Sequence, residues 1–258
     1  MKLPFIISIP HGGTTIPDNL KSFCLLSHKD ILMDSDTFTI PIFNLKEYVE
    51  AVIIQPLARA ILDVNRPITQ WPPDYPDGVI KSRSVQNGIV YNKDVFCLED
   101  IRKNMINEYQ NYHLKISELV VGKRLKIGLD CHSMLPIGPI TSKDPGNRRP
   151  LFNLGNCFGT SCSQEITEML AESIKVIFKI DKRDIVINKP FAGGYITKYH
   201  GYNPIPWIQI EMNKSLYLKE PYFNKNSFHI DPESLHKLKE KLGQTMILFY
   251  EYLVLSIV

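Results

Sequence analysis

The 258-residue sequence has no long hydrophobic run, since no stretch reaches the roughly 20 apolar residues that a membrane span needs. Residues 1–10 carry one lysine and a short apolar run broken by two prolines, which predicts a first strand rather than a signal peptide. We therefore expect a cytoplasmic protein with no membrane partner.

An excess of charge of one sign is also missing. Lys and Arg together number 30 and Asp and Glu 27, which leaves a net charge of +3. Nucleic-acid binding needs a larger excess of positive charge, so we expect no nucleic-acid partner. Hydrophobic residues make up 44% of the chain and charged residues 22%, which excludes a disordered or fibrous protein. The sequence has no internal repeat and no low-complexity tract.

The five cysteines lack the paired spacing of a thiolate metal site, and an odd number argues against a disulfide framework. We interpret them as reduced, mostly buried thiols of a cytosolic protein. Eighteen prolines stand against 14 glycines. Because proline breaks helix interiors, this proportion argues against an all-helical bundle.

What the sequence does contain is an alternation of two patterns. Short apolar runs predict strands at 5–8, 51–55, 60–64, 126–131, 184–187 and 207–212. Apolar residues near helical spacing predict helices at 36–49, 98–120, 163–179 and 232–252. Loops rich in proline and glycine are predicted at 67–88 and 133–150. The alternation predicts one α/β domain over residues 1–258, a three-layer sandwich with a central mixed, largely parallel sheet and helices on both faces.

Polar residues gather where the predicted strands end, which is where active sites collect in such folds. These residues are His11, Arg59, Asp63, Asn65, Arg66, Asp130, His132 and Glu211. Two histidines joined by a carboxylate can form a three-ligand zinc site with a fourth position open. Zinc lowers the pKa of water to about 7, and a carboxylate that is not a ligand can take the proton.

Two of the acidic residues have more than one interpretation. Asp130 could orient the imidazole of His132, or it could only cap the end of a strand. Glu211 lies inside an apolar strand, where burial without a partner is costly, and this favours a functional role.

Six motifs, in order, carry a family resemblance over residues 7 to about 217. They are Ile-Ser-Ile-Pro-His-Gly-Gly (7–13), Ser-Asp (35–36), Ala-Arg-Ala-Ile-Leu-Asp-Val-Asn-Arg (58–66), Asp-Cys-His-Ser (130–133), Pro-Phe-Ala-Gly-Gly-Tyr-Ile-Thr (190–197) and Gln-Ile-Glu-Met-Asn (209–213). This set resembles the N-formylglutamate amidohydrolase family. The resemblance implies a carboxypeptidase-like fold and a zinc hydrolase that cleaves the amide of an N-formyl or N-acyl amino acid.

The resemblance also implies residue roles at the metal. His11 and His132 would be zinc ligands, with Asp36 as the acidic ligand and Asp34 as its rival. Glu211 would be the general base. The nitrogen and oxygen ligands admit manganese or cobalt as well as zinc.

The remaining implied roles concern the substrate. Arg59, with Arg66 and Asn65, would face the substrate's carboxylate and scissile carbonyl, and Arg59 would be catalytic. Gly193 and Gly194 would let the backbone approach the substrate closely. Two alternatives stay open: an inactive binding or regulatory protein, and a hydrolase for a larger N-acyl amino acid, a peptide or a cell-wall fragment.

Overall fold

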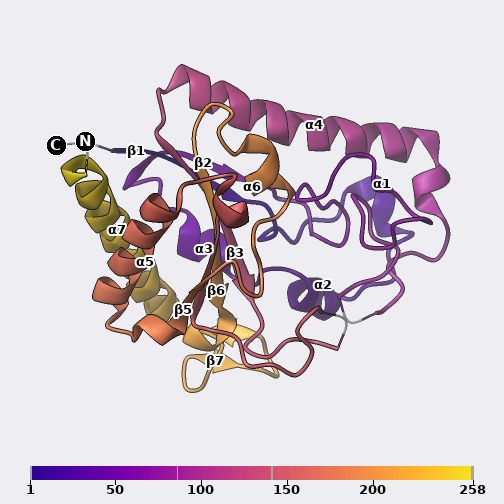
Figure 1. Ribbon diagram of the computed structural model, residues 1–258. Coiled ribbons are helices and arrows are strands. Elements are labelled where there is room, and N and C mark those ends of the chain that lie inside the picture. The colour runs from indigo at the N-terminus through magenta and orange to yellow at the C-terminus, as the bar shows by residue number, and fades with distance from the viewer. Residues whose placement is uncertain (1, 86, 141, 257–258) are drawn as a thin grey trace.

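A six-stranded sheet forms the centre of the computed structural model, which describes residues 2–85, 87–140 and 142–256 (Figure 1). Its strands are β1 (Leu3–Ile9), β2 (Val49–Ile54), β3 (Ile127–Met134), β4 (Phe152–Gly155), β5 (Ile185–Ile187) and β6 (Trp207–Asn213). Their order in the sheet is β2-β1-β3-β6-β4-β5. All neighbouring strands pair in parallel except β4 and β6, which are antiparallel. The predicted mixed, largely parallel sheet is therefore confirmed.

Helices cover both faces of this sheet, as predicted (Figure 1). The helices are α1 (Asp18–Lys21), α2 (His28–Asp34), α3 (Thr39–Phe43), α4 (Glu99–Gly122), α5 (Gln164–Phe178), α6 (Tyr195–His200) and α7 (Pro232–Leu255). Helix α4 packs on one face with the chain around residues 57–64, while α3, α5 and α7 pack on the other. A small hairpin, β7 (Phe223–Asn224) with β8 (His229–Ile230), follows β6.

Strand alternation divides the sheet into an apolar face and a partly polar face. Leu129 and Cys131 of β3 join the core under α5 and α7. Because successive side chains of a strand point to opposite faces, Asp130 and His132 face the α4 side. The same rule puts Glu211 of β6 on that side, since its neighbours Ile210 and Met212 belong to the other core. The sheet therefore presents polar side chains to the α4 side near its carboxyl end.

Two predicted elements are wrong. Residues 60–64 form a buried turn instead of a strand, with the backbone N–H groups of Ile61 and Leu62 donating to the carbonyl oxygen of Ala58. A short apolar run indicates that a segment is buried, but it does not distinguish a strand from a buried turn on the face of the sheet. The helix predicted at 36–49 is only α3, because the chain turns at Asn44 and reaches β2 by Val49.

Strands from both halves of the chain share the one sheet, and a single domain over residues 1–258 stays our prediction. Within the described residues, none of the helices has the length and apolar composition to span a membrane.

Candidate active site

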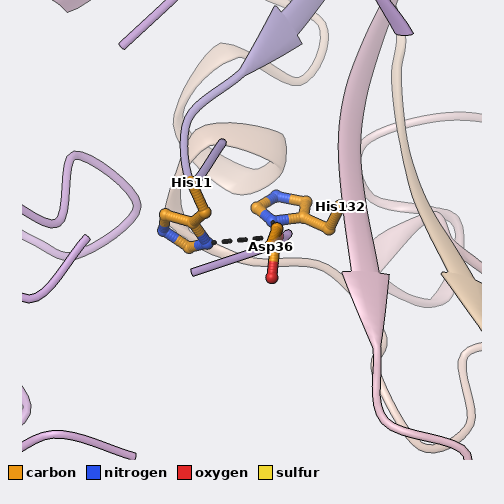
Figure 2. Close-up of side chains that lie close together, drawn as sticks. All are labelled: His11, Asp36 and His132. Atoms are coloured by element: carbon orange, nitrogen blue, oxygen red, sulfur yellow. Dashed lines mark hydrogen bonds and ion pairs between the residues drawn. The ribbon is translucent and has the colours of Figure 1, made fainter. Parts of the chain in front are cut away.

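Three side chains from separate elements meet near the carboxyl end of β1 and β3 (Figure 2). His11 follows β1, His132 lies in the second half of β3, and Asp36 lies between α2 and α3. The backbone N–H of Asp36 donates to the carbonyl oxygen of His11 at 2.9 Å, which joins the two loops. One potential ligand atom from each side chain lies within 4.8 Å of the others, and all three residues are buried.

The two imidazoles are oriented alike. Their Nδ1 atoms face the Oδ2 atom of Asp36, at 3.6 Å from His11 and 3.1 Å from His132. Their Nε2 atoms each face another carboxylate, Asp63 at 2.7 Å and Asp130 at 3.1 Å. Metal-binding histidines have this two-sided environment, in which a carboxylate on the far nitrogen fixes the tautomer. Of the two interpretations of Asp130, this geometry favours orientation of the His132 ring.

The electrostatics of the cluster favour a positive charge within it. Burial raises the pKa of Asp36, but hydrogen bonds and charge from His11 and His132 bring it far below its ordinary value. Burial lowers the pKa of His132, yet Asp130 and Asp36 raise it well above its ordinary value. Two imidazole nitrogens and a carboxylate oxygen fit a divalent cation such as zinc, with a fourth position left for water or substrate.

The structure separates the two rival aspartates. Asp36 is part of the cluster, whereas Asp34 is not. One oxygen of Asp34 accepts from the backbone N–H of Val85 at 2.6 Å, and the other is buried with no hydrogen-bond partner among the described residues. The geometry therefore favours Asp36 as the acidic ligand.

Glu211 stands beside the cluster on the neighbouring strand. Its Cα pairs with that of His132 in the β3–β6 register. Gln209 accepts from the backbone N–H of Gly194 at 2.5 Å through Oε1, so its Nε2 donates to Glu211 Oε1 at 2.8 Å. Burial raises the pKa of Glu211 to about 7, partly offset by the charge of His132. A carboxylate with such a pKa can exchange protons near neutral pH.

The two arginines differ in how their donors are used. Arg66 donates through Nε and Nη2 to Asp77 at 2.9 and 2.6 Å, and through Nη1 to the carbonyl oxygen of Asn65 at 3.1 Å. Arg59 donates through Nε to Asp63 at 3.4 Å, and its other guanidinium nitrogens have no hydrogen-bond partner among the described residues. Arg59 therefore has donors left for a substrate, while Arg66 is engaged with the protein.

Of the two predicted glycines, Gly194 packs against the site residue Asn65, whereas Gly193 packs against Cys157. Asn65 Oδ1 accepts from the backbone N–H of Ile196 at 2.8 Å, and its Nδ2 lies 3.3 Å from His132 Nε2. A Cβ at Gly194 would lie 2.6 Å from Asn65 Oδ1. Gly193 has φ +135, where side chains are strained. Gly194 thus lets the backbone approach Asn65 closely.

We expect Gly194→Ala to destabilise the protein and to displace Asn65. The added methyl must move Asn65 or the chain before α6, and such overpacking costs about 1–3 kcal/mol of unfolding free energy. Thermal unfolding checks this, with Gly122→Ala as the matched control because no atom lies within 4 Å of a Cβ there. Equal Tm values for the two variants would contradict the close packing at Gly194.

The sequence predicted no role for two buried residues that contact the site: Gln209, which donates to Glu211, and Lys81, which pairs with Asp63. Gln209 could have been found, because it lies two residues before Glu211 and strand period 2 puts both on one face. Lys81 carries no such signal, since lysine is ordinarily a surface residue.

The fold and the site together are those of a hydrolase built on a mixed α/β sheet. The model of the family described as N-formylglutamate amidohydrolase matches residues 3–218, and the chain belongs to this family. The resemblance stated from the six motifs is therefore confirmed. None of the curated proteins matches the sequence.

Solved structures share the fold. An N-formylglutamate amidohydrolase from Ralstonia eutropha JMP134 matches with a TM-score of 0.80 at 18% identity, covering 97% of this chain and 94% of that chain. A gene product of Agrobacterium tumefaciens matches with a TM-score of 0.65 at 16% identity, covering 98% of this chain and 92% of that chain. At these identities the likeness supports the fold.

Proposed function

We propose that the protein is a zinc-dependent amidohydrolase that cleaves the amide bond of an N-formyl or N-acyl amino acid, such as N-formylglutamate. The observation that carries this proposal is the buried His11–Asp36–His132 cluster with Glu211 beside it. These three residues would hold the zinc, which when bound supplies an activated water and polarises the scissile carbonyl. We also propose a cytoplasmic setting, supported by five free cysteines.

Glu211 moves the proton in this proposal. Its carboxylate accepts a proton from the attacking water as the new C–O bond forms. It then returns that proton to the amide nitrogen as the C–N bond breaks, so the products are a short carboxylic acid and a free amino acid. Gln209 holds one oxygen of Glu211, which fixes the direction of the carboxylate.

Arg59 binds the substrate in this proposal. A guanidinium with two unused nitrogens matches a carboxylate in a bidentate way and can also stabilise an oxyanion. Asp63 holds the Nε of Arg59, so the rest of the group is oriented before substrate arrives. In this proposal Asn65 and Arg66 line the substrate site beside Arg59. Gly193 and Gly194 provide backbone that lies close to the substrate.

Removal of metal is expected to abolish turnover. The purified protein is assayed with N-formyl-L-glutamate and a panel of N-formyl and N-acetyl amino acids, before and after chelation. We expect zinc at one ion per chain, loss of hydrolysis on chelation and its return when zinc is added.

The outcomes separate the candidate functions. Zinc-dependent hydrolysis of bulky acyl groups in place of formyl would indicate a larger substrate. Stoichiometric zinc without turnover of any substrate would favour a binding protein and contradict the amidohydrolase. Full turnover after chelation would contradict the metal dependence.

A further inference from the structure

Asp63 is a fully buried carboxylate. It contacts several charged groups, where an isolated ion pair would have one. Its partners are His11 Nε2 at 2.7 Å, the Asn65 backbone N–H at 2.9 Å, Lys81 Nζ at 3.1 Å, Arg59 Nε at 3.4 Å and Arg66 Nη1 at 3.6 Å. Three of these partners are the cationic side chains of Arg59, Arg66 and Lys81, which stabilise the ionised form of the carboxylate. Asp63 is therefore an anion that touches a candidate zinc ligand directly.

The contact with Asp63 decides how the His11 ring can bind a metal. A carboxylate only accepts hydrogen bonds, so His11 keeps its contact with Asp63 when Nε2 carries a proton, and Nδ1 is then the nitrogen left to bind a metal. In Figure 2 the Nε2 side of the ring points away from Asp36, and Nδ1 points toward it. Rotation of the ring would move both nitrogens, so the position of Asp63 sets the direction of the Nδ1 lone pair.

A short turn holds Asp63 at Oδ2, the carboxylate oxygen that His11 does not contact. We call residues 77–81 the Asp77–Lys81 turn, since these two residues form an isolated antiparallel bridge. Its Val79 carbonyl oxygen accepts from the backbone N–H of Asp63 at 2.8 Å. Asp77 contacts Lys81 and holds Arg66, which also faces Asp63.

Lys81 is the unusual member of this turn, because its side chain is 0% exposed. An ammonium group buried to this degree is costly unless it is paired, and its two anionic partners in the described residues are Asp63 and Asp77. The lysine does not reach solvent, so its charge acts on the carboxylates beside it.

We propose that Lys81 is a positioning residue for the metal site, which holds Asp63 so that Asp63 fixes the ring of His11. The inference rests on the proposed function, in which His11 binds zinc. The Asp77–Lys81 turn would then affect the affinity for zinc, although it is distant in sequence from every proposed ligand.

The test is the zinc affinity of Lys81→Met, measured by competition with a chelator of known affinity. Loss of the groups that orient metal-binding histidines typically weakens metal binding about 10–100-fold, and we expect an increase of that size in Kd. Cobalt bound in place of zinc gives a second readout, because its visible absorption bands shift when a ligand ring changes direction. Asp144→Asn is the matched control, since it removes the charge of an ion pair with Arg149 in another loop.

A double-mutant cycle tests whether Lys81 acts through Asp63. If it does, Lys81→Met adds little to the Kd change of Asp63→Asn, because the two side chains form one unit. Additive effects of the two changes would overturn the proposal. Asp77→Asn serves if Lys81→Met fails to fold, because the Asp77 side chain is 64% exposed and tolerates change. A zinc Kd within about threefold of wild type in Asp77→Asn would then overturn the proposal.

The same measurements separate this inference from the proposed function. Wild-type protein that binds zinc, together with folded Lys81→Met of unchanged affinity and cobalt spectrum, would overturn the inference alone. Wild-type protein that binds no zinc would overturn both.

Discussion

Glu211→Gln is expected to lower kcat by about 10²–10⁴-fold, the usual contribution of a positioned proton-transfer group. Glutamine keeps the shape of the side chain but cannot accept the proton of the attacking water. The amide can still face Gln209, so the strand and the zinc ligands should be undisturbed. The measurement is steady-state hydrolysis of the best substrate of the panel, alongside zinc content by elemental analysis.

A matched control is Glu172→Gln, the same chemical change at a half-exposed residue of α5 paired with Lys175. It should leave kcat within about twofold, because surface substitutions have small effects. Near-full turnover by Glu211→Gln with one zinc per chain would show that another group moves the proton. Loss of zinc from that variant would mean that Glu211 is a ligand.

The parts of the fold that the sequence predicts best are those with long periodic patterns. The sequence predicts a helix at 98–120, and α4 lies at Glu99–Gly122, because its apolar stripe repeats along the whole helix. Helix α7 begins at Pro232 after Asp231, as N-cap and N1 chemistry requires. Such local signals need no knowledge of the rest of the chain.

Short elements escaped prediction because the tertiary structure decides them. Strand β4 is four residues long and pairs antiparallel to β6, which no local pattern of Phe152–Gly155 reveals. Helix α6 is held at its N-terminus, where the backbone N–H of Ile196 donates to Asn65 and that of Gly194 donates to Gln209. Partners that lie far away in the sequence cannot be inferred from one sequence alone.

The candidate site also contains residues that the sequence predicts and residues that it does not. His11, Asp36 and His132 were predicted by motif resemblance, and the structure brings these three together. Their supporting residues were not predicted as a set, because a buried Lys81 looks like any other lysine in the sequence. The reason is physical: residues that touch metal need special chemistry, whereas those that orient them need only the right place.

The other prediction with a large expected effect concerns which aspartate, Asp36 or Asp34, is the acidic zinc ligand. Asp36→Asn should weaken zinc binding by at least about 100-fold, since loss of a direct ligand exceeds the 10–100-fold cost of losing an orienting partner. Asn keeps the volume but removes the charge that faces both histidine Nδ1 atoms. Hydrolysis at limiting zinc should fall with the affinity.

Asp34→Asn is the matched control two residues earlier, with the same substitution at a buried position. Its one bonded oxygen accepts from Val85, and an asparagine carbonyl can keep that hydrogen bond. Zinc titration of the two variants by chelator competition, with thermal unfolding of each metal-free protein, compares them directly. We expect Asp34→Asn to keep the wild-type Kd. The opposite ranking would make Asp34 the acidic ligand, and it would require the loop between α2 and α3 to rearrange when metal binds, because Asp34 lies outside the present cluster.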